Sequence, residues 1–350
     1  EDYFLRGTLK FESADGKFDA KLKASYAHMD RDSTPAGSTQ IFDCPLGAPQ
    51  LQVFAGNTTG VNDCRLDRNV ADPNISAATA AAAPYYLRDG KPFFKHKQFL
   101  SSLQMTLRPT DTLTLTSVTG YYNFKEDWNW NVSAGELESL VTGSRVRDKQ
   151  FTQELRLATS FESPFNVVVG SYYQFSEKRF EAPLVTTGFL TGFTGPLVLT
   201  DDRFLQKTEA YSFFGQGILT LSDQLEVTGG GRYSIEDKWL HLKRYPSLLS
   251  GFSPTPVEIA LDPRKVDFTD FSPEATIRFR PTRDITIYGA YREGFTSGGF
   301  NTAPASGGGD LTYRQARARG FEAGVKGSVL DRQLSFDASI YTYKYSDLQL

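Results

Sequence analysis

The chain has 350 residues, with 38 Lys and Arg against 41 Asp and Glu, and a formal net charge of −3. This near balance excludes nucleic-acid binding through a strongly basic surface. The hydrophobic content of 39% is too high for a disordered chain, and no run reaches the ~18 to 20 apolar residues of a membrane-spanning helix. The first residues carry no basic region followed by an apolar core, so we expect no signal peptide there.

Apolar residues recur at every second position along most of the chain, which is the pattern of strands with one apolar and one polar face. Phe18, Leu22 and Tyr26, for example, alternate with Asp19 and Lys21. Most of these segments are long enough to cross a bilayer at a tilt, which takes ~9 to 11 residues. The pattern predicts about twelve strands, at residues 2–13, 17–30, 98–108, 112–125, 149–161, 166–180, 207–221, 224–240, 266–280, 284–294, 318–330 and 333–347.

The connections between these strands alternate strictly between short and long. The short ones are rich in the turn formers Asp-Gly, Pro and Ser-Asp. The long ones exceed the ~12 to 15 residues beyond which loops are uncommon in compact domains. The long loops are expected at residues 31–97, 126–148, 181–206, 241–265 and 295–317.

Short turns at one end and long loops at the other are typical of an antiparallel, up-and-down transmembrane β-barrel. Aromatic residues near the long-loop ends predict an outer aromatic girdle, made of Tyr121, Tyr122, Phe124, Tyr172, Tyr173, Phe175, Trp239, Tyr341, Tyr343 and Tyr345. The alternative is a large soluble sandwich or propeller, in which the apolar faces would form a dry core. Neither of these folds explains the alternating loop lengths.

Three segments resemble TonB-dependent outer-membrane receptors, namely residues 150–157, 287–301 and 320–327. The second of these carries the motif residues Arg292, Gly294, Phe295, Ser297, Gly298, Gly299, Phe300 and Asn301. The resemblance implies a 22-stranded barrel whose lumen is closed by an N-terminal plug domain. This sequence shows no plug-like segment and only about twelve strands, so we expect residues 1–350 to be part of the barrel of a longer protein. An independent twelve-stranded barrel is the alternative.

Few residues suggest a disulfide, a metal site or a catalytic site. Cys44 and Cys64 fit no metal-binding spacing, and in an oxidising exterior they would form a disulfide worth about 3 kcal/mol; two free thiols are the alternative. The alanine-rich run at residues 77–83 predicts either a short helix or a flexible segment. His28, His96 and His241 show no ligand spacing, so we expect no metal site and no cofactor. Because the nucleophile, phosphate-loop and dinucleotide motifs are also absent, we expect no enzyme activity.

Ligand recognition is expected near the long loops, where aromatic and basic side chains would suit a bulky anionic ligand such as an iron chelate. The candidate ligand-binding residues are Tyr85, Tyr86, Trp128, Trp130, Arg145, Arg147, Phe189 and Phe193. The alternative for any one of them is ordinary loop packing or contact with lipopolysaccharide. Arg292 and Asn301 are expected to be structural or to face the plug.

The resemblance implies an outer-membrane receptor of a Gram-negative bacterium, which takes up a scarce solute by a TonB-dependent mechanism, with a ferric siderophore as the preferred candidate. Expected partners are outer-membrane lipid, lipopolysaccharide, the ligand, and TonB through a plug absent from this chain. Nucleic acid is not expected, and the protein should be a monomer. The alternatives are a passive pore or adhesin-like barrel, and a soluble carbohydrate-binding or hydrolytic β protein.

Overall fold

The computed structural model describes residues 1–32, 50–54, 57–62, 75–132, 140–186, 195–251, 255–260, 264–301 and 311–348. Most of them belong to one antiparallel sheet, whose path is β1-β2-β5-β6-β7-β8-β9-β10-β12-β13-β16-β17. These strands are β1 (Asp2–Glu12), β2 (Phe18–Arg31), β5 (Phe94–Thr110), β6 (Leu113–Asn131), β7 (Leu140–Thr159), β8 (Phe165–Thr186), β9 (Leu197–Thr220), β10 (Leu225–Arg244), β12 (Lys265–Thr282), β13 (Ile285–Thr296), β16 (Ala316–Val329) and β17 (Leu334–Ser346). Each of them overlaps one of the twelve predicted strands, in the same order, so the meander is confirmed.

Smaller elements lie in the connections. The helices α1 (Ala77–Ala82) and α2 (Pro84–Leu87) follow the paired strands β3 (Gln50–Phe54) and β4 (Asn57–Asn62), and a 3-10 turn spans Leu248–Ser250. The short strand β11 (Val257–Ile259) pairs with β10, and β14 (Gly299–Phe300) pairs with β15 (Thr312–Tyr313). Neither α1 nor α2, the α-helices of the described part, is long and apolar enough to cross a membrane.

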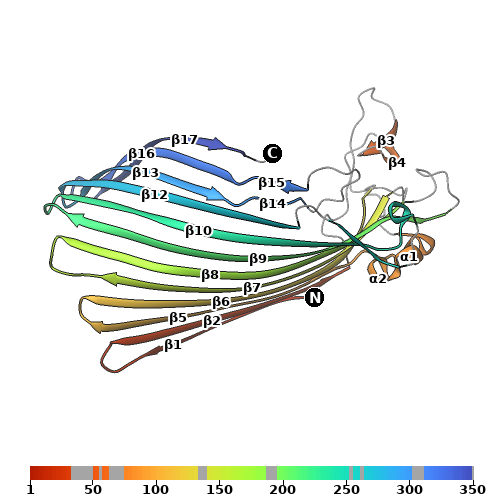
Figure 1. Ribbon diagram of the computed structural model, residues 1–350, viewed down its shortest axis with the longest axis horizontal. Helices are drawn as coiled ribbons and strands as arrows, with labels where there is room; N and C mark the ends of the chain where they lie inside the picture. The colour runs from red at the N-terminus through yellow and green to blue at the C-terminus, as the bar shows by residue number, and fades with distance from the viewer. Residues whose placement is uncertain are drawn as a thin grey trace.

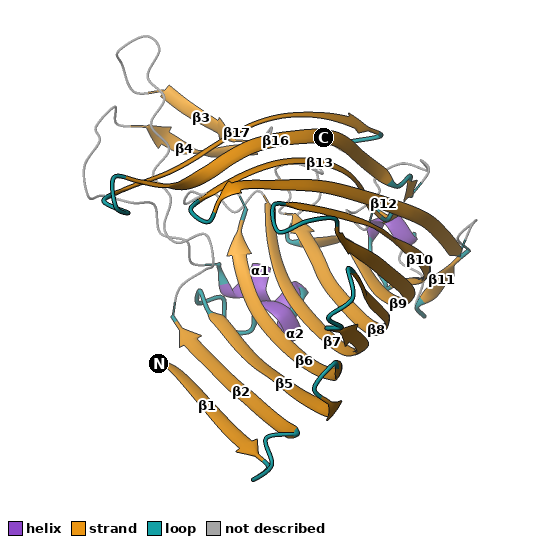
Figure 2. Cartoon of the chain, turned by 90° about the vertical axis from the view of Figure 1, so that its left-hand side faces the viewer, coloured by secondary structure: helices purple, strands orange, loops and turns teal. Residues whose placement is uncertain are grey.

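The two ends of the sheet differ (Figure 1). The tight turns lie together at one end, the turn end, and the long connections lie at the other, the loop end. In the first turn the Asp15 carboxylate accepts a hydrogen bond from the backbone N–H of Lys17 at 3.1 Å, and Gly16 supplies the left-handed backbone with φ 66°. Figure 2 shows that the sheet is strongly curved, with its edge strands β1 and β17 apart. The described residues therefore form an open wall rather than a closed barrel.

Several strands run farther toward the loop end than predicted. β7 begins at Leu140 rather than near residue 149, and β9 begins at Leu197 rather than near residue 207. In these extensions polar residues occupy both faces, so the alternation of apolar and polar residues stops. The backbone ladder continues nevertheless, with Asp127 opposite Arg145 in unbroken register. The predicted loops 126–148 and 181–206 are consequently strand over much of their length.

The two faces of the sheet differ in chemistry, and we call them the apolar face and the polar face. The apolar face carries exposed Leu155, Phe213 and Phe321, which are 53%, 61% and 61% accessible. The polar face carries paired groups such as Gln216, whose side-chain amide donates to Glu274 at 3.0 Å. Because the apolar rows are exposed instead of meeting in a dry core, the soluble-sandwich alternative is wrong.

Aromatic rings line the loop-end border of the apolar face. Tyr173 lies 5.0 Å from Tyr211 and 6.4 Å from Phe151, measured between ring centroids. The strand register places Tyr121, Tyr173, Phe175 and Trp239 on the apolar face, as predicted for the girdle, but places Tyr122, Phe124, Tyr172, Tyr341, Tyr343 and Tyr345 on the polar face, so the prediction is wrong for these six. Consecutive residues of a strand point to opposite faces, so only one of each adjacent pair can belong to the girdle. The other member of each pair lies on the polar face.

Candidate ligand-binding site

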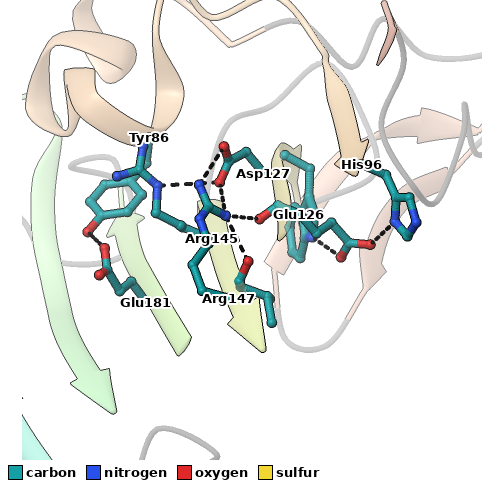
Figure 3. A network of polar contacts seen from close by, with 9 residues as sticks. Tyr86, His96, Glu126, Asp127, Arg145, Arg147 and Glu181 are labelled. Carbon is teal, nitrogen blue, oxygen red and sulfur yellow. Dashed lines mark hydrogen bonds and ion pairs between the residues drawn. The ribbon is translucent and has the colours of Figure 1, made fainter. Parts of the chain in front are cut away.

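The first group of predicted site residues lies on the polar face at the loop end of β5 and β6. The indole Nε1 of Trp128 donates to Glu126 Oε1 at 3.2 Å, and Glu126 Oε2 lies 3.4 Å from His96 Nδ1 (Figure 3). The His96 ring meets Phe124 edge to face, with 4.9 Å between the centroids. Trp130 shares this face by alternation, and both tryptophans are partly accessible. This surface offers aromatic rings beside a carboxylate and an imidazole.

The second group lies on the opposite face. Arg147 Nη2 donates to Asp127 Oδ2 at 2.9 Å, and Arg145 Nε donates to Asp127 Oδ1 at 3.3 Å. The guanidinium carbon of Arg145 lies 3.8 Å from the centroid of the Tyr85 ring. Arg145 and Arg147 have the same parity as Leu155, and the β6–β7 register is unbroken between them. They therefore extend the apolar face beyond its aromatic border.

Tyr86 fixes α2 to this second group. Its phenol donates to Glu181 Oε2 at 2.8 Å, as Figure 3 shows, and Arg203 lies 5.6 Å from its ring centroid. Burial, and secondarily the hydrogen bond to Glu181, raise the pKa of Tyr86. The phenol therefore keeps its proton and remains a donor throughout the physiological pH range.

The sequence around α1 and α2 explains how they come to lie there. Ser76 caps α1 by accepting from the backbone N–H of Thr79 at 3.2 Å, and Pro84 begins α2 at a position where no backbone donor is needed. The helix at residues 77–83 is thus confirmed rather than a flexible segment. Leu87 is fully buried in a cluster with Val141 and Val185 on the strands below. The helices consequently cover the loop-end extensions of β6 to β9.

Asn129 holds the chain that leaves α2, and sequence reasoning missed it. Its amide nitrogen donates to the carbonyls of Lys91 at 2.8 Å and Leu87 at 3.3 Å, while its Oδ1 accepts from the backbone N–H of Phe93 at 3.2 Å. The side chain is completely buried. An asparagine in a segment expected to be a loop carries no sequence signal for such a role.

The family-like motif crosses the polar face beyond the end of β13. The Lys238 ammonium donates to Ser297 Oγ at 2.9 Å and to the Gly298 carbonyl at 2.6 Å. A Cβ on Gly298 would lie 2.1 Å from the Tyr313 carbonyl oxygen, so only glycine fits there. Phe300 is buried in a cluster with Phe204, Leu240 and Leu242. This segment therefore packs against the polar face of β10.

The remaining motif residues have structural partners. Arg292 pairs with Glu322 at 3.8 Å, and the Asn301 backbone N–H donates to the Leu311 carbonyl at 2.6 Å. Gly294 and Phe295 lie in β13, which pairs along its length with β16. The structural or plug-facing role of Arg292 and Asn301 stays a prediction.

The predicted ligand-binding residues are therefore divided between two faces of one wall. Trp128 and Trp130 lie on the polar face, whereas Tyr85, Tyr86, Arg145 and Arg147 gather beyond the apolar face. Phe189 and Phe193, and the predicted disulfide partners Cys44 and Cys64, lie outside the described residues. Within the described ranges, no group of three or more His, Cys, Asp or Glu side chains could hold a metal ion.

Residues 46–350 match the family described as TonB dependent receptor-like, beta-barrel. The chain is 22% identical over 314 residues to a probable TonB-dependent siderophore receptor, PiuA, of Acinetobacter baumannii, covering 79% of this chain and 41% of PiuA.

Solved structures share the fold. The ferric yersiniabactin uptake receptor FyuA of Yersinia pestis gives a TM-score of 0.64 at 14% identity, covering 100% of this chain and 53% of FyuA. The ferric-catecholate import receptor Fiu of E. coli K12, in its closed form, gives 0.65 at 14% identity, covering 97% and 50% of the two chains. The chain thus spans about half the length of these proteins.

These receptors are outer-membrane transport proteins of Gram-negative bacteria rather than enzymes, which agrees with the expected localisation. The apolar face accordingly contacts the hydrocarbon of the outer membrane, and the polar face lines the interior. The chain belongs to the TonB-dependent receptor family and forms part of its β-barrel domain.

Proposed function

We propose that this chain forms half of the wall of a receptor that captures a ferric siderophore and imports it with energy delivered through TonB. Three similar proteins support the choice of solute, because PiuA, FyuA and Fiu are described as siderophore, ferric yersiniabactin and ferric-catecholate receptors. Contact with TonB would be made by a plug domain outside residues 1–350.

The observation that carries this proposal is the contrast between the two faces of the sheet. An exposed apolar face beside a hydrogen-bonded polar face suits a wall between lipid and an aqueous lumen. At the loop end this lumenal face presents Trp128 and Trp130 from β6, with exposed Lys178 two strands away on β8. Aromatic rings and a cation on one surface suit a large anionic chelate.

Four of the predicted ligand-binding residues take one of two roles in this proposal. Trp128 and Trp130 contact the ligand directly, because they face the lumen. Arg145 and Tyr86 act indirectly. The guanidinium of Arg145 is paired with Asp127, and the phenol of Tyr86 donates to Glu181 and so holds α2 against the wall.

Uptake of radioactive iron tests the proposal. The full-length receptor would be expressed in a strain that lacks its own siderophore receptors, and accumulation would be measured with catecholate, hydroxamate and phenolate ferric chelates. We expect accumulation of at least one chelate, abolished by deletion of TonB or by a protonophore. Accumulation that continues without TonB would indicate a passive pore instead. Failure with all three chelate classes would reject a siderophore as the solute.

A further inference from the structure

The base of the β14–β15 hairpin is folded onto the lumenal side of the wall, at the loop end beyond β13 (Figure 1). Phe300 of β14 is buried in one cluster with Leu240 of β10, and a Cβ on Gly298 would lie 2.7 Å from the ring of Phe268 in β12. Leu240 and Phe268 occupy polar-face positions, because the β9–β10 and β10–β12 registers are unbroken. Since packed β layers lie about 10 Å apart, the hairpin base stands about that far inside the wall.

Backbone pairing between β12 and β13 does not extend to this part of the chain. Within residues 264–301 the β12–β13 ladder ends at Glu274 and Arg292, although β12 continues to pair with β10 as far as Lys265. The end of β13 stays paired with β16 instead. An ion pair of 2.9 Å between Arg317 Nη2 and Asp270 Oδ1 joins the two sides of this division. The position of the segment that follows β13 therefore depends on side-chain contacts with β10 and β12.

Lys238 of β10 makes the polar contact that fixes the hairpin base. Its ammonium donates to Ser297 Oγ at 2.9 Å and to the Gly298 carbonyl at 2.6 Å, and it lies 3.1 Å from Glu236 Oε1. A lysine ammonium has three N–H donors, so these three oxygens engage all of them. The Lys238 side chain is only 12% accessible. Removal of the ammonium would leave three oxygens without their donor in a place that water reaches poorly.

We infer that Lys238 is a positioning residue for solute capture, which holds the base of the β14–β15 hairpin as a fixed inner rim of the entrance. The rim lies on the same face as Trp128 and Trp130, so a solute that enters from the loop end passes it. If the hairpin base were free to leave the wall, solute binding would have to order it. The apparent affinity would then fall in proportion to the fraction of molecules whose rim is in place. The effect on affinity rests on the proposed function, whereas the attachment of the hairpin base does not.

Hydrogen exchange and uptake in the full-length receptor test the inference. Lys238→Met keeps the aliphatic stem and removes the ammonium, and Lys238→Arg restores a cation. Ser297→Ala removes one acceptor of the same ammonium and leaves its pair with Glu236, so it keeps the test decisive if Lys238→Met does not fold. Lys243→Met is the matched control, because Lys243 is exposed at an odd position of the same strand and therefore lies on the other face.

Exchange of residues 297–300 and 311–313 is measured on the purified receptor without solute. Uptake is measured with the ferric chelate that the wild type accumulates, over a range of concentrations. Heat-modifiable migration on gels shows which variants are folded.

We expect Lys238→Met to speed exchange of residues 297–300 about tenfold and to raise the half-saturating chelate concentration about tenfold at an unchanged maximal rate. Ser297→Ala should change both in the same direction, by about threefold, because one of three hydrogen bonds is lost. Lys238→Arg should restore most of the wild-type behaviour, and Lys243→Met should match the wild type.

Unchanged exchange of residues 297–300 in the folded Lys238 and Ser297 variants would overturn the inference. Faster exchange with an unchanged half-saturating concentration would overturn the role in capture, as would a loss confined to the maximal rate. If the wild type accumulates no ferric chelate, the proposed function fails, while the exchange measurement still decides whether Lys238 holds the hairpin base.

Discussion

Adjacent residues of this wall have opposite environments, and that alternation determines what each side chain can do. Glu126 bonds the indole of Trp128 on the lumenal side, while Asp127 binds Arg145 and Arg147 on the other side. A list of aromatic and basic residues chosen near a predicted loop therefore mixes two surfaces. Odd and even positions of a strand face opposite sides, so a residue's position assigns it to one of the two surfaces. This works only where the strand is known to extend that far.

Replacement of Trp128 by alanine should weaken binding of the imported chelate about tenfold, because one aromatic contact is worth about 1 kcal/mol or slightly more. The matched control is Tyr121→Ala on the same strand, since Tyr121 is exposed on the lipid side. Fluorescence titration of the purified receptor with each ferric chelate measures the effect. An equal loss of affinity in both variants would contradict the lumenal assignment of Trp128.

At the scale of elements, the strands were predictable and their ends were not. Period-two alternation located all twelve strands because Leu155, Phe213 and similar residues must face lipid. Beyond the membrane both faces meet water, so Arg145 and Asp127 pair across strands with no hydrophobic signal. The site was predictable only in its residue types, since the contacts of Asn129 and Tyr86 depend on how α2 lies on the sheet.

The contact between α2 and the sheet can be tested by comparing substitutions of the adjacent Tyr85 and Tyr86. Tyr86→Phe removes the hydrogen bond to Glu181 and should destabilise the docked helices by about 1 kcal/mol, or about fivefold in local opening. Tyr85→Phe is the control, because Tyr85 is 59% accessible and its hydroxyl has no hydrogen-bond partner within the described residues. Hydrogen exchange of residues 75–93 measures the opening. Equal exchange in the two variants would show that the phenol of Tyr86 does not hold the helix.

The β9–β10 hairpin gives a second prediction at this scale. A Cβ on Gly230 would lie 2.5 Å from the Gly215 carbonyl oxygen, whereas a Cβ on Gly229 would meet nothing within 4 Å. Gly230→Ala should therefore force the two strands apart at a cost of about 1–3 kcal/mol, and Gly229→Ala should not. The yield of heat-modifiable, folded receptor in outer membranes reports the difference. Normal yield from the Gly230 variant would show that the strands approach less closely than the structure has them.

At the scale of the whole molecule, the open sheet with unpaired edges at β1 and β17 agrees with a chain that spans about half of FyuA and Fiu. Exposed N–H and C=O groups cannot be left in hydrocarbon, so the wall needs further strands to close it. The resemblance to TonB-dependent receptors predicted this arrangement from motifs. Composition and periodicity alone left an independent twelve-stranded barrel as the alternative.

The most direct test of the account is the solvent that each face contacts. Spin labels would be placed singly at Leu155, Val169 and Phe213, and at Glu154, Gln216 and Glu274, in the full-length receptor with Cys44 and Cys64 replaced by Ser. In proteoliposomes the first set should collide freely with lipid-dissolved oxygen and weakly with a water-soluble nickel chelate. The second set should be shielded from oxygen. Shielding of positions 155, 169 and 213 from the lipid would contradict the account.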